Sequence, residues 1–170
     1  GFMKSTEQVG HYSAAYKIIM ILLTAVWCYQ DAVFPVISNY YKTSTDSLKK
    51  IQSYSTKVMI TLTLPLAIGG TIFAKPIMNL IYGGKYDPGV IALQILIWTV
   101  TIGSLHGVYV RGLIACDRQN KRLIIAIVHA IIVIALNFVF IPLFGLIGAA
   151  IVTVSAEFLV IFFSYREFSK

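Results

Sequence analysis

The chain has 170 residues, of which 58% are hydrophobic and only 12% are charged, and its mean hydropathy is +0.80. Soluble domains carry about 25% charged residues, so this composition excludes an ordinary water-soluble fold. The many large apolar side chains exclude a disordered chain. We therefore expect an integral membrane protein. The formal net charge of +7 does not indicate a nucleic-acid partner, because excess Lys and Arg in a membrane chain more often marks cytoplasmic loops.

Five apolar stretches predict five membrane-spanning helices, because a helix needs about 20 apolar residues to cross the hydrocarbon core. Between the first two stretches lies a polar segment, residues 42–57, which we expect to be a connection. The predicted fold class is all-α, a polytopic transmembrane helix bundle. The predicted spans are residues 13–41, 58–82, 90–111, 123–141 and 145–165.

Proline and glycine residues predict where these spans bend or end. Pro65 and the pair Gly69-Gly70 are expected to bend the second span. Residues 83–89 contain Gly-Gly and Pro-Gly pairs and predict a turn. Pro142 and Gly145 are expected to divide an apolar stretch that is too long for one crossing.

Lys and Arg residues are distributed unevenly between the two sides that these spans define. One side carries ten of them and the other carries four. The ten are Lys42, Lys49, Lys50, Lys57, Arg111, Arg118, Lys121, Arg122, Arg166 and Lys170. Cytoplasmic loops carry the excess of Lys and Arg, so we expect this side, with the C-terminus, to be cytoplasmic. The first span then begins outside, and position 1 is not Met, so we expect a fragment of a longer transporter.

Polar residues recur at intervals of seven along the first predicted span. Lys17, Thr24, Asp31 and Ser38 fall on nearly one line of a helix. Lys17 and Asp31 are about 21 Å apart along the axis at 1.5 Å per residue, which excludes a direct salt bridge between them. Charges at membrane depth turn toward protein or water. The stripe therefore lines a hydrated cavity, or Lys17 extends to the outer interface while Asp31 bonds a neighbouring helix. The sequence leaves both interpretations open.

Two further charged residues lie within predicted spans. Arg111 is about one turn inside the cytoplasmic boundary, where its planar guanidinium either holds a phosphate or extends to the inner headgroups. Glu157 lies near the middle of the fifth span and is a candidate proton or cation site, or half of a charge pair with a helix absent from this chain. His106 and His129, also mid-span, are interpreted as hydrogen-bonding contacts between helices.

No residue pattern indicates catalysis or a cofactor. The sequence contains no HExxH, no GxSxG and no glycine-rich phosphate loop. Cys28 and Cys116 are far apart and lack CxxC spacing, so they predict neither a disulfide framework nor a zinc site. We therefore expect a protein that is not an enzyme and has no catalytic residues, no metal and no cofactor.

Four ordered motifs resemble those of bacterial polysaccharide (O-antigen type) flippases. Residues 9–17 are similar to that family's VGxYSAAYR segment, and residues 34–38 resemble the end of the same helix. Residues 64–68 and 80–86 resemble its LPLA…LIFGxxY pattern. Residues 141–150 are similar to its IPLFGxxGAA turn between two helices. The resemblance runs over nearly the whole chain.

The flippases belong to the multidrug/oligosaccharidyl-lipid/polysaccharide exporter superfamily, and the resemblance implies a particular architecture. Two six-helix lobes would surround a central cavity as repeats about an axis along the membrane normal. This chain would supply the last five helices of the C-terminal lobe of a transporter with roughly 12–14 helices. Its partners would be the missing N-terminal lobe, the lipid bilayer and a lipid-linked oligosaccharide. Lys17 occupies the basic position of the family's AAYR segment.

The resulting hypothesis is a flippase that exports a lipid-linked oligosaccharide across the cytoplasmic membrane of a bacterium or archaeon by alternating access. Lys17, Thr24, Asp31 and Arg111 are the expected cavity residues, with Lys17 and Arg111 attracting the pyrophosphate. Asp31 or Glu157 is expected to carry the coupling ion or proton. Two alternatives are a cation-coupled multidrug exporter of the same superfamily and a non-transporting membrane scaffold subunit.

Overall fold

The computed structural model describes residues 6–168, and within this range the chain forms helices and short turns with no strand. The segments are α1 (Thr6–Thr43), α2 (Thr45–Ile72), α3 (Ala74–Tyr82), the 3₁₀ helix η1 (Gly84–Gly89), α4 (Val90–Leu96), α5 (Trp98–Ala115) and α6 (Gln119–Phe168). The all-α fold class predicted from the sequence is therefore confirmed.

Within residues 6–168, five helical stretches are long and apolar enough to cross a membrane, as the sequence predicts. The third of them joins η1, α4 and α5 into one nearly continuous rod, and α6 supplies the last two. The stretches are Val9–Thr43, Thr45–Ile72, Gly84–Ala115, Gln119–Gly145 and Ile147–Glu167.

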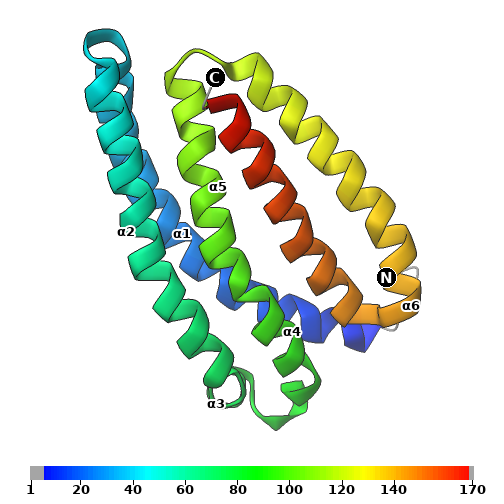
Figure 1. The fold of residues 1–170 in the computed structure, drawn as a ribbon. Coiled ribbons are helices and arrows are strands. Elements are labelled where there is room, and N and C mark those ends of the chain that lie inside the picture. The colour runs from blue at the N-terminus through cyan, green and yellow to red at the C-terminus, as the bar shows by residue number, and fades with distance from the viewer. Residues whose placement is uncertain (1–5, 169–170) are drawn as a thin grey trace.

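Helix α5 is the centre of the bundle. It packs against α1, α2 and α6, and Figure 1 shows it between α2 and the second half of α6, with α1 crossing obliquely behind. Ser104, Val108 and Leu113 of α5 are almost completely buried. The middle of the third span is therefore the part of the chain that holds the other helices together.

Interhelical hydrogen bonds join α2 to α5. Gln52 of α2 donates to the carbonyl of Val108 at 3.1 Å, and Thr101 of α5 donates to the carbonyl of Thr63 at 3.0 Å. Gln52 and Thr63 are both buried. In an apolar solvent such bonds contribute to helix association because the hydrophobic effect does not distinguish protein from lipid tails.

Helix α2 begins much earlier than the predicted start of the second span at position 58. Ser44 caps it, with its side chain accepting a hydrogen bond from the backbone N–H of Ser47 at 3.3 Å. The buried residues Leu48, Gln52 and Ser55 recur at helical spacing and pack inward. The segment 42–57 is thus helical from Thr45, because its polar residues occupy the outer face of a helix.

The second predicted span breaks at Phe73, whereas Pro65 and Gly69-Gly70, where the sequence predicts a bend, lie within the continuous helix α2. Pro76 has no N–H to donate to the carbonyl of Ile72, so the helical ladder is interrupted at this point. The chain continues as helix α3. The turn predicted at residues 83–89 follows α3 and consists of Gly83, whose φ is 77°, and the 3₁₀ helix η1.

Helix α6 folds back on itself at Gly145, where the sequence predicts the division between the fourth and fifth spans. Gly145 adopts φ 60° and ψ −132°, a conformation open essentially to glycine alone. Gly148 lies so close to the carbonyl of Phe140 that a Cβ at this position would collide with the backbone. The two halves of α6 therefore form a tight antiparallel hairpin (Figure 1).

The connections that the sequence assigns to one side of the membrane lie at one end of the bundle. Figure 1 shows the α1–α2 turn, the α5–α6 connection and the C-terminal end of α6 at this end. There Arg118 donates to the carbonyl of Glu167 at 2.7 Å, and Lys121 pairs with the Glu167 carboxylate at 3.7 Å. Lys4 and Lys170 lie outside the described residues, and the cytoplasmic assignment of this end stays a prediction.

Candidate functional site

A cavity of about 240 Å³ lies between α1, α5 and the second half of α6. We call it the α1–α5–α6 cavity. Its wall combines aromatic and small residues with three ionisable groups, which are His106, Arg111 and Glu157. The other residues that line it are Tyr16, Leu23, Trp27, Thr99, Gly103, Gly107, Val110 and Thr153.

A hydrogen bond between a histidine of α5 and a glutamate of α6 forms part of this wall. Nδ1 of His106 lies 2.9 Å from Oε2 of Glu157, and the two side chains are 25% and 24% exposed. One of the interpretations of Glu157 was a charge pair with a helix absent from this chain. In the structure its partner is His106, which belongs to this chain. The interpretation of His106 as a contact between helices is confirmed.

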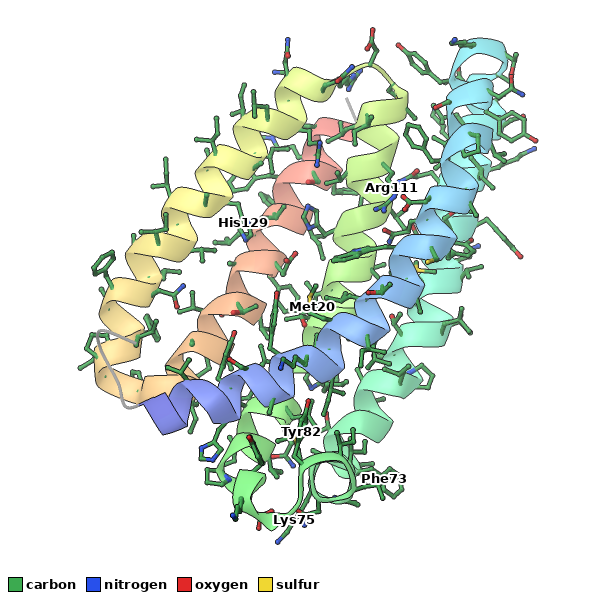
Figure 2. All side chains as sticks on the ribbon, turned by 180° about the vertical axis from the view of Figure 1, so that it is seen from behind. Met20, Phe73, Lys75, Tyr82, Arg111 and His129 are labelled. Atoms are coloured by element: carbon green, nitrogen blue, oxygen red, sulfur yellow. The ribbon has the colours of Figure 1, made fainter. Side chains whose placement is uncertain are left out.

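Arg111 joins α5 to α1 at the edge of the same cavity. Its Nε and Nη2 donate to Oδ1 of Asp31 at 2.9 and 2.7 Å, and its Nη1 donates to Oε1 of Gln30 at 2.5 Å. Gln30 is buried and in turn donates to the carbonyl of Ser104 at 2.7 Å. Figure 2 shows Arg111 where α5 meets α1. The guanidinium is therefore oriented by two neighbouring residues of one helix.

The predicted stripe of Lys17, Thr24 and Asp31 does not line this cavity. All three residues are exposed on α1, and Tyr16, Leu23 and Trp27 line the wall in their place. The Thr24 hydroxyl donates to the carbonyl of Met20 in its own helix at 2.8 Å. Asp31 bonds a neighbouring helix, as the second of the two open interpretations anticipates. Whether the stripe faces water stays a prediction.

A second hollow, of about 440 Å³, lies between the start of α1 and the first half of α6. Asn137 and Phe138 line it from α6, and Tyr12 lines it from α1. The Tyr12 hydroxyl is 3.3 Å from Oγ1 of Thr153, which also lines the α1–α5–α6 cavity. Thr153 therefore lies at the boundary between the two hollows.

Sequence reasoning missed the pairing partners in this site. The buried amide of Gln30 and the Arg111–Asp31 pair were not anticipated, although Gln30 is a polar residue beside Asp31 within an apolar stretch. His129 was interpreted as a helix contact, but its Nε2 is buried and has no hydrogen-bond partner in the described part of the chain. A signal in the sequence that could have related such residues is the number of residues between each of them and the end of its helix, because helix ends on the same side of the bundle place equal counts at the same height.

The site contains hydrogen-bonding and charged groups without a metal cluster. Among the described residues, no group of three or more His, Cys, Asp or Glu side chains is placed to hold a metal ion. Cys28 and Cys116 are free thiols. Chemically, the cavity presents a guanidinium that has five N–H donors, of which three are used by Asp31 and Gln30.

Comparisons with known proteins point to one kind of transporter. The family described as "Lipid II flippase MurJ" matches residues 14–170. The chain is 23% identical over 154 residues to the probable low-salt glycan biosynthesis flippase Agl15 of Haloferax volcanii. It is 29% identical over 160 residues to the probable flippase AglR of the same organism. The alignments cover 90% of this chain in both cases.

A third relative is the uncharacterized membrane protein MJ1068 of Methanocaldococcus jannaschii, 29% identical over 163 residues. The chain spans about a third of the length of these relatives, with 33%, 33% and 31% of each covered. No solved structure gives a significant match to it. The resemblance to flippases predicted from the motifs is therefore supported at the level of flippases, whereas the O-antigen subfamily stays a prediction.

Proposed function

The chain belongs to the lipid II flippase MurJ family, and on this premise we propose that it forms part of a transporter that moves a lipid-linked glycan across the cytoplasmic membrane of a bacterium or archaeon. The five membrane-crossing helices and the glycan flippases among its relatives support this proposal. The end that carries Arg118 and Lys121 is proposed to be cytoplasmic, as the excess of Lys and Arg indicates.

The observation that carries the proposal is the position of Arg111. It lines the α1–α5–α6 cavity and is held by Asp31 and Gln30, so its guanidinium is oriented before any ligand arrives. Two of its five N–H donors remain for an anion, and a planar fork suits phosphate oxygens. We assign Arg111 the role of binding the phosphate group that links lipid and glycan.

The other predicted cavity residues take lesser roles in this proposal. Lys17 is exposed on α1 and is proposed to attract the same anionic group as a point charge from outside the α1–α5–α6 cavity. Asp31 is proposed to orient Arg111 rather than to carry a coupling ion, because a permanent cation already pairs with it. The Thr24 hydroxyl donates a hydrogen bond to a backbone carbonyl of its own helix, and we propose no contact with the substrate for this residue beyond its place in the polar stripe.

The experiment is a flipping assay with the full-length protein in vesicles that contain a fluorescent lipid-linked oligosaccharide. Replacing Arg111 by Ala is expected to reduce the flipping rate about tenfold or more, because charge-assisted hydrogen bonds contribute about 1.5–3 kcal/mol. Arg111→Lys is expected to restore part of the rate, since lysine keeps the charge without the fork. Arg122→Ala, an exposed cation at the same end, is the control and should flip normally.

A second variant separates substrate binding from a structural role. Asp31→Asn removes the charge that neutralises Arg111 but leaves its guanidinium in the cavity. If Arg111 binds the substrate, this variant loses less of the flipping rate than Arg111→Ala does, because Gln30 still holds Nη1 of the guanidinium. Equal loss in Asp31→Asn and Arg111→Ala would show that the ion pair only joins α1 to α5, and the proposed role of Arg111 would be wrong.

A further inference from the structure

Three ionisable side chains from three separate helical segments lie at the same depth. Position 106 is nine residues before the end of α5 at 115, position 129 is ten residues after the start of α6 at 119, and position 157 is ten residues before the end of the last span at 167. These three ends lie together (Figure 1). At 1.5 Å per residue each group is about 15 Å from that end, which is the middle of a hydrocarbon core of about 30 Å.

Two of the three side chains are in direct contact, since His106 and Glu157 form the 2.9 Å hydrogen bond described above. Among residues 6–168, Nε2 of His129 is buried without a hydrogen-bond partner, and Glu157 and His106 lie close enough to act on this imidazole electrostatically. In Figure 2 His129 lies between the two halves of α6. One carboxylate therefore bonds the imidazole of α5 and lies near a second, unpartnered imidazole on the first half of α6.

The remaining titratable groups around this cluster are accounted for on each neighbouring element. Helix α1 contributes Tyr16 to the cavity and Tyr12, whose hydroxyl bonds Thr153 one turn from Glu157. Helix α5 contributes Arg111, which is neutralised by Asp31, and Tyr109, whose ring packs against that of Tyr165 in the second half of α6. Helix α4 has no titratable residue, and Lys121 in the first half of α6 is about two turns away and pairs with Glu167.

Electrostatics limits the charge that this cluster can hold. A lone ionised group at this depth costs several kcal/mol, whereas a carboxylate and an imidazole that share one proton are neutral as a pair. The second imidazole is the group that can take a further proton. Imidazole is the side chain whose ordinary titration falls between about pH 5 and 8. The cluster therefore suits a proton better than a permanent charge.

We propose that His106, Glu157 and His129 form a proton-binding site at mid-membrane depth, with Glu157 shared between the two imidazoles. A proton binds Nε2 of His129, and the Glu157 carboxylate exchanges its hydrogen bond with His106 for one with His129. His106, which lines the cavity, then gives its own proton to cavity water, so the cluster stays neutral. Transfer of the His129 proton through Glu157 to His106 restores the first bond. The step transfers one proton and makes and breaks one hydrogen bond.

This proton site has a mechanical consequence for the bundle. Exchange of the Glu157 bond moves the attachment of the second half of α6 from α5 to its own first half. The inference deepens the proposed function and rests on it only for the coupling of this proton to flipping. It favours Glu157 over Asp31 as the coupling residue, because the Asp31 side chain is 70% exposed and already paired with a permanent cation.

The site itself is tested without transport, by infrared difference spectroscopy of the full-length protein in lipid nanodiscs between about pH 5 and 8. The expected result is a carboxylate signal in the wild type that shifts with pH as the hydrogen bond of Glu157 exchanges. Glu157→Gln should abolish this signal, and His129→Gln should remove its shift with pH. His11→Gln is the matched control, because His11 bonds the carbonyl of Lys85 at the opposite end of the bundle and should leave the signal unchanged. An unchanged signal in both cluster variants overturns the proposal.

Flipping measured over the same pH range tests the coupling. A one-proton site changes a rate by at most about tenfold per pH unit, and the Glu157→Gln variant is expected to lose this dependence. The variant Glu157→Asp keeps the charge and should keep a pH dependence. A flipping profile identical in wild type and Glu157→Gln overturns the coupling. A full-length protein that flips no lipid-linked glycan at any pH refutes the proposed function instead, and the spectroscopic titration still decides the proton site.

Discussion

The helices around α5 and the first half of α6 are held in place by different means. More than half of the residues in the most apolar window of the third span, Gly84–Ala115, are buried, at a mean hydropathy of 1.7. The fourth span, Gln119–Gly145, has a mean hydropathy of 2.9 and no buried residue in its window. The more hydrophobic helix is thus the less buried one, because lipid solvates apolar side chains as well as protein does.

The comparison shows where the bundle is rigid and where it is loosely attached. Around α5, side chains such as Gln30, Gln52 and Thr101 bond neighbouring helices. The first half of α6 has no buried residue in its most apolar window, and the turn at Gly145 and the ion pair of Lys121 join its two ends to the second half. A helix with few interior contacts moves at low cost. We therefore expect conformational change to involve the first half of α6 relative to α5.

The largest expected effect breaks the turn of the α6 hairpin. Replacing Gly148 by Ala places a Cβ against the backbone carbonyl of Phe140, which cannot move aside as a flexible side chain would. Overpacking of this kind costs about 1–3 kcal/mol. The measurement is the thermal unfolding midpoint of the full-length protein in detergent micelles. Gly69→Ala is the matched control, because no atom lies within 4 Å of the added Cβ, and helix propensity should make it neutral or stabilising. Equal midpoints in the two variants would show that the hairpin turn is not tight.

A smaller effect is expected in the α5 region from Gln30→Leu. This variant removes the bond to the Ser104 carbonyl and one of the contacts that orient Arg111. Interhelical hydrogen bonds in membranes contribute about 0.6–2 kcal/mol, so we expect a loss of about 1–2 kcal/mol in unfolding free energy. Unfolding in denaturing detergent measures it. Thr24→Val serves as the control, since the Thr24 hydroxyl bonds only its own helix. An equally large loss of unfolding free energy in Thr24→Val would mean that removing any polar side chain from α1 lowers the stability, and that the contact between α1 and α5 is not its cause.

Local sequence signals predicted the number of spans and the hairpin at Gly145. Both depend on properties read within one segment, namely hydropathy over about 20 residues and the backbone restrictions of proline and glycine. The same local method was wrong about α2. The length of a charge-free segment predicts which residues lipid surrounds. It does not predict where the helix begins, because a helix continues into polar sequence as long as its backbone hydrogen bonds are satisfied. Pro65 and Pro76 both lack an N–H, yet α2 continues through Pro65 and ends at Ile72, four residues before Pro76.

The pairings within the site could be predicted only in part. Arg111, Asp31 and Glu157 were singled out because charge at membrane depth is costly, and that argument needs no tertiary structure. Their partners depend on how α1 tilts across α5 and on which face of α6 turns inward. Neither property is encoded in a single segment. Gln30 was missed for this reason, since an amide reveals its role only when the helix that it bonds is known.

The smallest expected effect concerns Cys116, in the connection between the α5 region and the first half of α6. Burial raises the pKa of the Cys116 thiol above its ordinary value, and the nearby Arg118 charge partly opposes this shift. The thiolate is the reactive form, so the maleimide labelling rate of a Cys28→Ser protein should continue to rise above about pH 8.5, where an unshifted thiol begins to level off. Removing the positive charge by Arg118→Gln should raise the pKa further and slow labelling at neutral pH. A profile that levels off at the ordinary value would show that the connection is open to water, and that the first half of α6 is attached even more loosely than its contacts indicate.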